Sequence, residues 1–189
     1  MRHGRRPGGQ GIPAQCRAVR PAGLRPLIHQ SSLATIHPAT EADGPLAESL
    51  HQDCSEANLL LRWGRTRITH RDFTRLLDHC DVWIGLDAEG RPLAMVSAGL
   101  VSHEAGVVDL GLQVADAHQR RGIGTLLARH AADNARRRGA HTLTAYLQAA
   151  NTPMLSLLAR LGPAVHTRDG SHLDVRIPLG DTPAGHEPS

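Results

Sequence analysis

The sequence predicts an α/β fold in which a mixed central sheet of six to seven strands, with one splayed parallel pair, is flanked by about four to five helices. Runs in which apolar residues alternate with others cluster between residues 81 and 114, the longest helical pattern follows at 122–138, and strand and helix patterns then alternate. Strands grouped before a long helix and interleaved with helices after it are typical of a mixed sheet covered by helices.

Short elements are expected before the grouped strands. Residues 33–37 alternate as a short strand, and Thr40, followed three residues later by an acid, predicts the start of a helix that runs to about residue 50. Residues 55–63 and 70–79 space their apolar side chains three and four apart, which predicts two more short helices.

The grouped strands and the later elements follow from the same patterns. Period-two runs and turn residues predict a hairpin, a third strand, a strand–helix unit and a closing hairpin. In chain order, the strands are expected at 81–86, 92–101, 107–114, 141–147, 164–168 and 172–177, and the last helix at 152–161.

One face of the long helix at 122–138 is expected to cover the sheet. Its apolar residues recur at helical spacing, and Gly139 is placed to end it. The residues predicted on the buried face are Ile123, Leu126, Leu127, His130, Ala131 and Ala135.

The chain of 189 residues is expected to form one domain, at 32–179. Residues 1–31 are rich in Pro, Gly and Arg without an apolar period, which predicts a disordered arm, and 180–189 are expected to be a disordered tail. There is no signal-peptide pattern and no apolar run of membrane-spanning length, so a cytoplasmic protein without a membrane partner is expected. A monomer and a homodimer both stay open.

The charge distribution does not favour a nucleic-acid-binding domain. Six Arg and no acid lie in residues 1–31, and subtracting these six cations from the formal net charge of +3 leaves −3 for the remainder. The arm could touch anionic surfaces, but no specific nucleic acid is expected as a partner, because no DNA-reading motif accompanies it. The three cysteines have no paired spacing and the histidines are scattered, so no metal cofactor is expected.

The segment with the clearest chemical pattern lies between the strand at 107–114 and the long helix. It contains Gln119, Arg120, Arg121, Gly122, Ile123, Gly124 and Thr125. Glycines at a helix start let successive backbone N–H groups approach an anion, where the helix dipole also favours negative charge. A Walker loop is excluded because no Lys-Ser/Thr pair follows. The pattern therefore predicts a pyrophosphate-binding loop.

This loop resembles the Gln/Arg-x-x-Gly-x-Gly/Ala signature of the GNAT (Gcn5-related) N-acetyltransferases, with Gln119, Gly122 and Gly124 at its fixed positions. The resemblance extends from about residue 33 to 179, because the elements follow in family order. Residues 114–119 and 151–155 are most similar to the bacterial Pat-type protein lysine acetyltransferases. The resemblance implies the GNAT fold and transfer of acetyl from acetyl-CoA to a primary amine, with a protein lysine slightly preferred over a small-molecule amine.

The resemblance also implies how acetyl-CoA is bound. Leu112, Gln113 and Val114 lie on the strand that splays from its parallel neighbour, so their backbone would pair with the pantetheine arm and hold the developing oxyanion of the thioester. Asn151 would contact the same arm, although capping of the helix at 152 is an equal alternative. Arg120 and Arg121 would reinforce phosphate binding, or be merely exposed at a helix start.

Asp109 is the candidate general base, since the attacking amine must lose a proton. On a strand it shares one face with Gly111 and Gln113, opposite the apolar residues. Pat-type proteins have a Glu at the matching place, so Asp109 is a departure with shorter reach. Glu104, His103, a water relay and a merely solvated Asp109 remain alternatives.

A second departure lies seven residues after Asn151, where many family members have a Tyr that protonates the leaving thiolate. This chain has Leu158 there, and its single tyrosine, Tyr146, is expected to pack. The alternative to an enzyme is therefore a non-catalytic GNAT module that binds acyl-CoA. Nucleic-acid binding by the Arg-rich arm is the weakest alternative.

Overall fold

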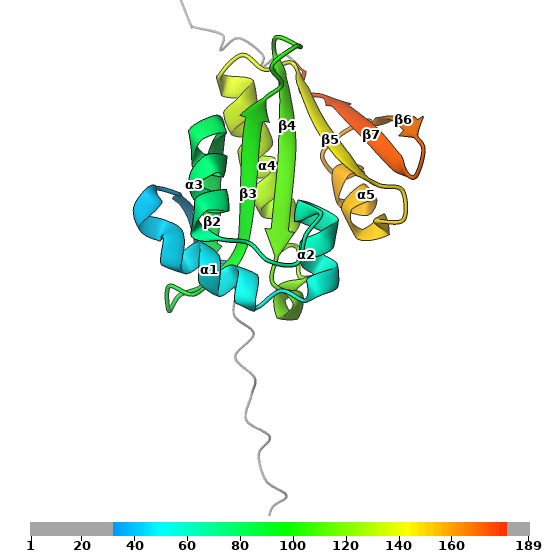
Figure 1. The fold of residues 1–189 in the computed structure, drawn as a ribbon. Helices are drawn as coiled ribbons and strands as arrows, with labels where there is room; N and C mark the ends of the chain where they lie inside the picture. The colour runs from blue at the N-terminus through cyan, green and yellow to red at the C-terminus, as the bar shows by residue number, and fades with distance from the viewer. Residues whose placement is uncertain (1–31, 181–189) are drawn as a thin grey trace, which may run out of the picture. The chain divides into compact units, whose positions relative to one another are not determined.

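The computed structural model describes residues 32–180, so the predictions for residues 1–31 and 181–189 lie outside the described residues. Five α-helices, two short 3-10 turns and seven strands make up this part (Figure 1). In chain order they are β1 (Thr35–Pro38), η1 (Glu41–Asp43), α1 (Gly44–Gln52), α2 (Glu56–Trp63), α3 (His70–His79), β2 (Cys80–Leu86), β3 (Pro92–Leu100), β4 (Val107–Val114), η2 (Asp116–His118), α4 (Ile123–Arg137), β5 (Thr142–Gln148), α5 (Thr152–Leu158), β6 (Val165–Asp169) and β7 (His172–Pro178).

The strands form one sheet in the order β1-β2-β3-β4-β5-β7-β6. All neighbours are antiparallel except β4 and β5, which pair in parallel. The long helix α4 connects these two strands, as a parallel crossover requires. The predicted fold class is confirmed, including the parallel pair and the number of helices.

Helices cover both faces of the sheet. In Figure 1, α1, α2 and α3 lie in front of the central strands and α4 lies behind them. The larger apolar cluster packs α4 against one face and includes Val96, Leu127 and Leu143, whereas Leu50 and Phe73 belong to the cluster on the α1 and α3 side. Both faces of the central strands are therefore buried, which leaves little open sheet surface except where strands separate.

Local signals place the ends of the helices. Ser55 and Thr69 cap α2 and α3 by accepting backbone N–H bonds, and both helices lie within a residue of their predicted bounds. Thr40 and Asp43 do form a capping box, but it starts the 3-10 turn η1, so α1 begins only at Gly44. The acid three residues after Thr40 therefore marked a turn that leads into the helix.

The buried face of α4 differs from the prediction at Leu126, whose side chain is 51% exposed. Gly124 is buried, and a Cβ there would lie 3.1 Å from a methyl group of Leu112. The helix therefore approaches β4 closely at a residue without a side chain, and its buried face is turned toward Leu127, Ala128 and Ala131. An apolar pattern alone does not reveal this rotation, because glycine carries no hydrophobic signal.

Within residues 32–180, no helix combines the length and the apolar character that crossing a membrane requires.

Candidate active site

The parallel pair β4 and β5 is held together over only part of its length. Pairing runs from Val107 with Thr142 to Asp109 with Thr144 and then stops. Beyond this point β4 continues to Val114 and β5 to Gln148, and Figure 1 shows the two strands diverging toward the end of β4. The expected splayed pair is therefore present, and it opens after Asp109.

The ladder with β3 shows which backbone groups of β4 face the opening. Val101 N–H donates to Val107 O, and Ala115 N–H donates to Leu93 O. Because antiparallel hydrogen-bonded pairs alternate, the odd-numbered residues of β4 bond to β3 and the even-numbered ones turn their N–H and C=O groups the other way. Leu110, Leu112 and Val114 therefore present backbone groups to the gap between the strands, where a ligand can pair with them.

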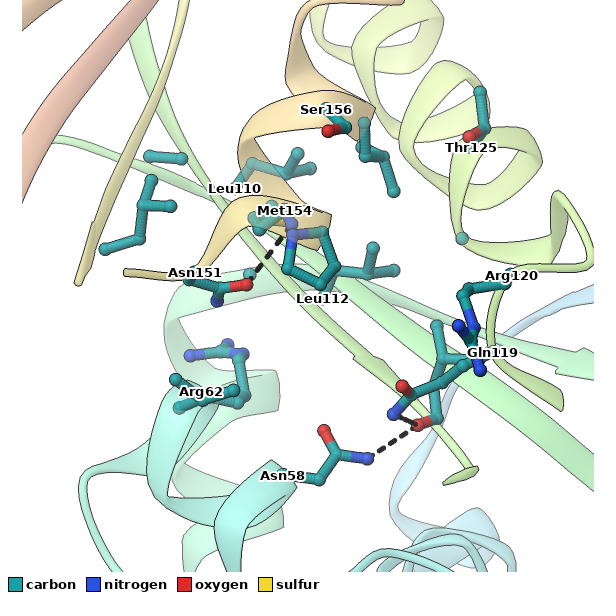
Figure 2. A pocket seen from close by; sticks show the side chains of 18 of the residues that line it. Asn58, Arg62, Leu110, Leu112, Gln119, Arg120, Thr125, Asn151, Met154 and Ser156 are labelled. Carbon is teal, nitrogen blue, oxygen red and sulfur yellow. Dashed lines mark hydrogen bonds between the residues drawn. The ribbon is translucent and has the colours of Figure 1, made fainter. Parts of the chain in front are cut away.

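The gap opens into a cavity of about 1000 Å³ that continues to the start of α4. Ten of the twelve residues predicted for the site line it, while Gln113 and Ile123 do not. Those that line it are Asp109, Leu112, Val114, Gln119, Arg120, Arg121, Gly122, Gly124, Thr125 and Asn151. Figure 2 shows the loop residues Gln119 and Arg120 at one end and Asn151 with Arg62 at the other.

The loop before α4 has the backbone geometry of an anion cradle. Arg120 has φ 58° and Gly122 has φ 83°, so left-handed residues are interposed just before the helix. Gly122 is the N-cap and supplies no side-chain hydrogen bond to the helix. The first N–H groups of a helix have no intrahelical partner, and at the start of the 15-residue α4 they are available to an anion.

The loop is tied to the end of β4 through the Val114 carbonyl. Asn58 Nδ2 on α2 donates to Val114 O at 2.8 Å, and Gln119 Nε2 donates to the same oxygen at 3.3 Å. Both amides also reach Asp116 Oδ1, at 2.6 and 3.3 Å. Asn58 and Gln119 therefore hold the β4 terminus in place, and the Val114 carbonyl already has donors.

Gln113 is not positioned as a cofactor contact through its side chain, although it was grouped with Leu112 and Val114. Its side chain is 1% exposed and lies on the α2 side of the sheet, where Nε2 donates to Asn58 Oδ1 at 2.7 Å. Ile123 is likewise buried, in the core under α4. Sequence spacing placed both residues at the site, whereas their side chains hold its framework.

Asn151 combines the two roles that the sequence left open. Its Oδ1 accepts from Met154 N–H at 3.2 Å and so caps α5, and the residue also lines the cavity (Figure 2). Because the cap uses only the oxygen, the Nδ2 amide group keeps its donors for a ligand in the cavity.

Asp109 lies where the strands part, on the α2 side of the sheet. Its side chain is exposed within the cavity, and the surrounding protein raises the pKa of its carboxyl above the usual value through desolvation. The nearby Arg62 guanidinium opposes this shift, while the carboxylate of Asp174 adds to it. Its raised pKa and its place in the cavity make Asp109 a candidate general base.

A sequence model of the Acetyltransferase (GNAT) family matches residues 46–162, a span that includes the splayed strands and the loop. The chain belongs to the GNAT acetyltransferase family. Membership implies acyl-CoA-dependent acyltransferase activity.

Solved GNAT structures share the fold at low sequence identity. The GNAT domain of S. lividans PAT has a TM-score of 0.69 at 20% identity, over 80% of this chain and 98% of that one. Spermidine N-acetyltransferase from Vibrio cholerae, in complex with CoA and spermine, has a TM-score of 0.62 at 13% identity, over 77% and 95%. The yncA protein of Salmonella typhimurium, solved with its cofactor acetyl-CoA, has 0.59 at 23%, over 79% and 96%. No curated protein matches by sequence.

The two alternative general bases, Glu104 and His103, lie outside the cavity. Arg176 donates to both carboxylate oxygens of Glu104 at 2.7 Å, which lowers the pKa of that carboxyl. His103 is exposed, with Nε2 3.6 Å from Glu104 Oε1. Neither residue lines the cavity, and a carboxylate held by a bidentate Arg is a poor proton acceptor. Asp109, alone or through water, remains as the base candidate.

Leu158 is buried in the core, whereas Tyr146 lines the cavity. Leu158 is 1% exposed in the core between α5 and the sheet, so it does not line the cavity. Tyr146 is 57% exposed and does line it, contrary to the expected packing role; its hydroxyl donates to Asp169 Oδ2 at 3.0 Å and its ring stacks on His172. The cavity therefore contains one phenol, already hydrogen-bonded to a carboxylate.

Sequence reasoning missed Arg62, which lines the cavity beside Asp109. It lies on α2, far from the loop in the sequence, and its short helix was assigned only from apolar spacing. No local motif marks it, because its place in the site depends on α2 packing across β4. Among residues 32–180, no group of three or more His, Cys, Asp or Glu is arranged to hold a metal ion.

Proposed function

We propose that this protein is an N-acetyltransferase that moves the acetyl group of acetyl-CoA to a primary amine. The observation that carries the proposal is the single cavity that joins the β4–β5 gap, the glycine loop at α4 and Asp109. A phosphate cradle alone would suit many ligands. A cradle that continues into a strand gap with free backbone groups suits a phosphate-bearing arm as long as that of CoA.

In this proposal the chain holds acetyl-CoA at two places. The N–H groups at the start of α4 bind the pyrophosphate, with Arg120 and Arg121 adding charge. The even-numbered residues of β4 pair with the pantetheine arm, and the Asn151 amide donates to it from the opposite side. Acetyl-CoA supplies an activated acyl group, so its thioester must lie near the point where the strands part.

Asp109 acts on the acceptor in this proposal. A primary amine is mostly protonated at neutral pH, and its lone pair is needed for attack. Asp109 takes the proton directly or through water, the amine nitrogen then forms the new C–N bond, and the C–S bond breaks. The second amine proton ends on the departing sulfur, so the products are the amide, CoA thiol and one released proton. A backbone N–H of β4 stabilises the negative charge on the carbonyl oxygen.

The acceptor within this proposal is a protein lysine or a small-molecule amine. The likeness to the GNAT domain of S. lividans PAT supports the former and the likeness to spermidine N-acetyltransferase the latter. The second candidate function is a module that binds acyl-CoA without turnover. It is favoured by Leu158, which is buried where many relatives have an acid.

The test measures binding and turnover separately. Calorimetry with acetyl-CoA should show binding by the parent and its loss in Gly122→Val, because a branched side chain at φ 83° would strain the loop and block the close approach of phosphates. Gly139→Val is the matched control: Gly139, beyond the other end of α4, has φ 87° and equally open surroundings, but does not line the cavity.

Both substitutions should destabilise the fold similarly, and only Gly122→Val should weaken binding. Thiol release from acetyl-CoA in the presence of amines and lysine-containing proteins then distinguishes the two functions. Binding without any thiol release would support the non-catalytic module. Unchanged affinity in Gly122→Val would refute the loop assignment.

A further inference from the structure

Arg62 occupies an unusual position on the floor of the cavity. It lies in the last turn of α2 and extends over β4 at Gly111, where a Cβ would fall 2.0 Å from its Nη2. Its Nη2 donates to Ser97 Oγ at 2.9 Å, and its guanidinium carbon lies 4.6 Å from the centre of the Trp63 ring. The missing side chain at Gly111 therefore makes room for a cation against the sheet.

This cation has no anionic partner among residues 32–180. No carboxylate oxygen of the described residues lies within 4.0 Å of its nitrogens, and the neutral Ser97 hydroxyl is its one hydrogen-bond acceptor there. A guanidinium has five N–H donors, and removing it from water without a compensating anion is costly. Loss of hydration accordingly lowers the pKa of Arg62. The remaining donors belong to a side chain that lines the cavity (Figure 2).

Asp109 supplies the opposite charge a short distance away. Asp109 and Gly111 are two residues apart on one face of β4, which corresponds to about 7 Å along the strand. The two side chains affect each other electrostatically without forming an ion pair: Arg62 lowers the pKa of Asp109, and Asp109 raises that of Arg62. The cavity thus has a site for an ammonium group next to a site for a carboxylate.

The geometry points to an acceptor whose amine has a carboxylate close by, as in an α-amino acid, with Arg62 binding the carboxylate and Asp109 receiving the amine. This assignment rests on the proposed acetyl transfer. In an α-amino acid the two charged groups are attached to the same carbon, so both side chains can contact one small molecule. An acceptor that is cationic throughout, such as a polyamine, would leave Arg62 unpaired and be repelled by it.

The first measurement compares acceptors with and without the carboxylate, and each rate is expressed per neutral amine because loss of the carboxylate also lowers the pKa of the amine. Thiol release is measured with the standard α-amino acids and with their α-carboxamides, which keep the amine and side chain but lose the charge. At least one amino acid should exceed its carboxamide in kcat/KM by about 10- to 100-fold, as expected for a hydrogen-bonded charge pair. Equal or faster turnover of every carboxamide would overturn the inference and leave the proposed function standing.

The second measurement attributes the preference to Arg62. Arg62→Gln should reduce the ratio of kcat/KM for the amino acid to kcat/KM for its carboxamide to near one. Arg62→Lys should keep part of this preference, because the positive charge remains although the planar guanidinium is lost. The ratio is informative because a change in the pKa of Asp109 affects both acceptors alike. Arg137→Gln, an exposed arginine of α4 outside the cavity, is the matched control and should keep the parent ratio. A preference that survives Arg62→Gln would refute the assignment.

A binding experiment tests the carboxylate site even if no amine is acetylated. Calorimetry of the CoA-bound protein with N-acetyl amino acids and N-acetyl amino carboxamides should show tighter binding of the acids, lost in Arg62→Gln. Such binding without turnover would support the carboxylate site and refute the proposed acetyl transfer. Neither binding nor turnover would refute both.

Discussion

Replacing Asp109 by Asn tests the base assignment most directly. The substitution keeps the size of the side chain and removes its capacity to accept a proton. Because general-base catalysis contributes about 100- to 10,000-fold, kcat should fall by that factor. Affinity for acetyl-CoA should barely change, since the loop from Gln119 to Thr125 lies at the other end of the cavity. The loss should therefore be seen in kcat.

The pH dependence follows from the raised pKa of Asp109. A base must be deprotonated, so the activity of the parent should decline on the acid side at a higher pH than an ordinary aspartate would give. Asp109→Asn should not show this decline at acid pH. Its activity should rise with pH, because more of the amine is then neutral. Arg62→Gln should move the decline at acid pH to still higher pH, because the Arg62 cation partly offsets the rise in the pKa of Asp109.

Stability gives an independent readout with a defined sign. A carboxyl whose pKa is raised by folding binds its proton more tightly in the folded state, so it costs stability as pH rises above 3.8 through the folded pKa. Asp109→Asn removes this cost at neutral pH and should not lower the melting temperature there. A less active yet equally or more stable variant would exclude misfolding as the cause.

The assay is initial-rate thiol release across pH 6 to 9, about the range in which amines need help to lose a proton. Asp109→Glu should retain activity, because the added methylene extends the same carboxylate. Asp78→Asn, an exposed acid of α3 outside the cavity, is the control. If Asp109→Asn matched the parent throughout this range, proton transfer would have to proceed without this carboxylate, and the assignment would be wrong.

Three further predictions concern the rest of the chain. Leu158→Ala should cost about 2 to 5 kcal/mol of stability in urea unfolding, because its side chain is fully buried, while activity per folded molecule at low temperature changes little. A loss of several orders of magnitude in the folded variant would contradict a packing role. Burial lowers the pKa of His51 to about 4, so its stability contribution is lost as pH falls from 6.5 toward 4. His51→Phe keeps the edge-on packing with Trp63 and should reduce the loss of folding stability at acid pH by up to about 3 kcal/mol. An equal loss of stability in the parent and the variant would refute this role of His51. The chain has no Lys, so mass spectrometry after incubation with acetyl-CoA should find no acetyl-lysine on it, whatever its activity.

The sequence was sufficient for the elements whose signals are local. The strand β4 and the helix α3 have the predicted bounds, because alternation and a Thr cap depend only on neighbouring residues. The turn that precedes α4 was predicted for the same reason, whereas its binding of a pyrophosphate stays a prediction. The GNAT fold followed from the order of these elements together with this loop.

Contacts between residues that are far apart in the chain could not be predicted from the sequence. Arg62 belongs to the site only because α2 packs across β4 at Gly111, and Glu104 leaves it only because Arg176, on β7, binds its carboxylate. Gln113 was expected among the cofactor-binding residues, but its side chain is buried and bonds to Asn58 on α2. Each of these contacts joins residues about fifty or more positions apart in the sequence, where no local pattern carries information.

Both strands that border the gap are held in the sheet along their other edges. Strand β4 pairs with β3 from Val108 to Val114, and β5 pairs with β7 from Thr142 to Gln148. Asn58 also fixes the end of β4 from α2. The unpaired backbone groups of β4 and β5 thus lie on the side of the gap, except for the Val114 carbonyl, which accepts from Asn58 and Gln119. The same α2 that anchors β4 carries Arg62, so the helix that helps to keep the gap open also brings the unpaired cation beside Asp109.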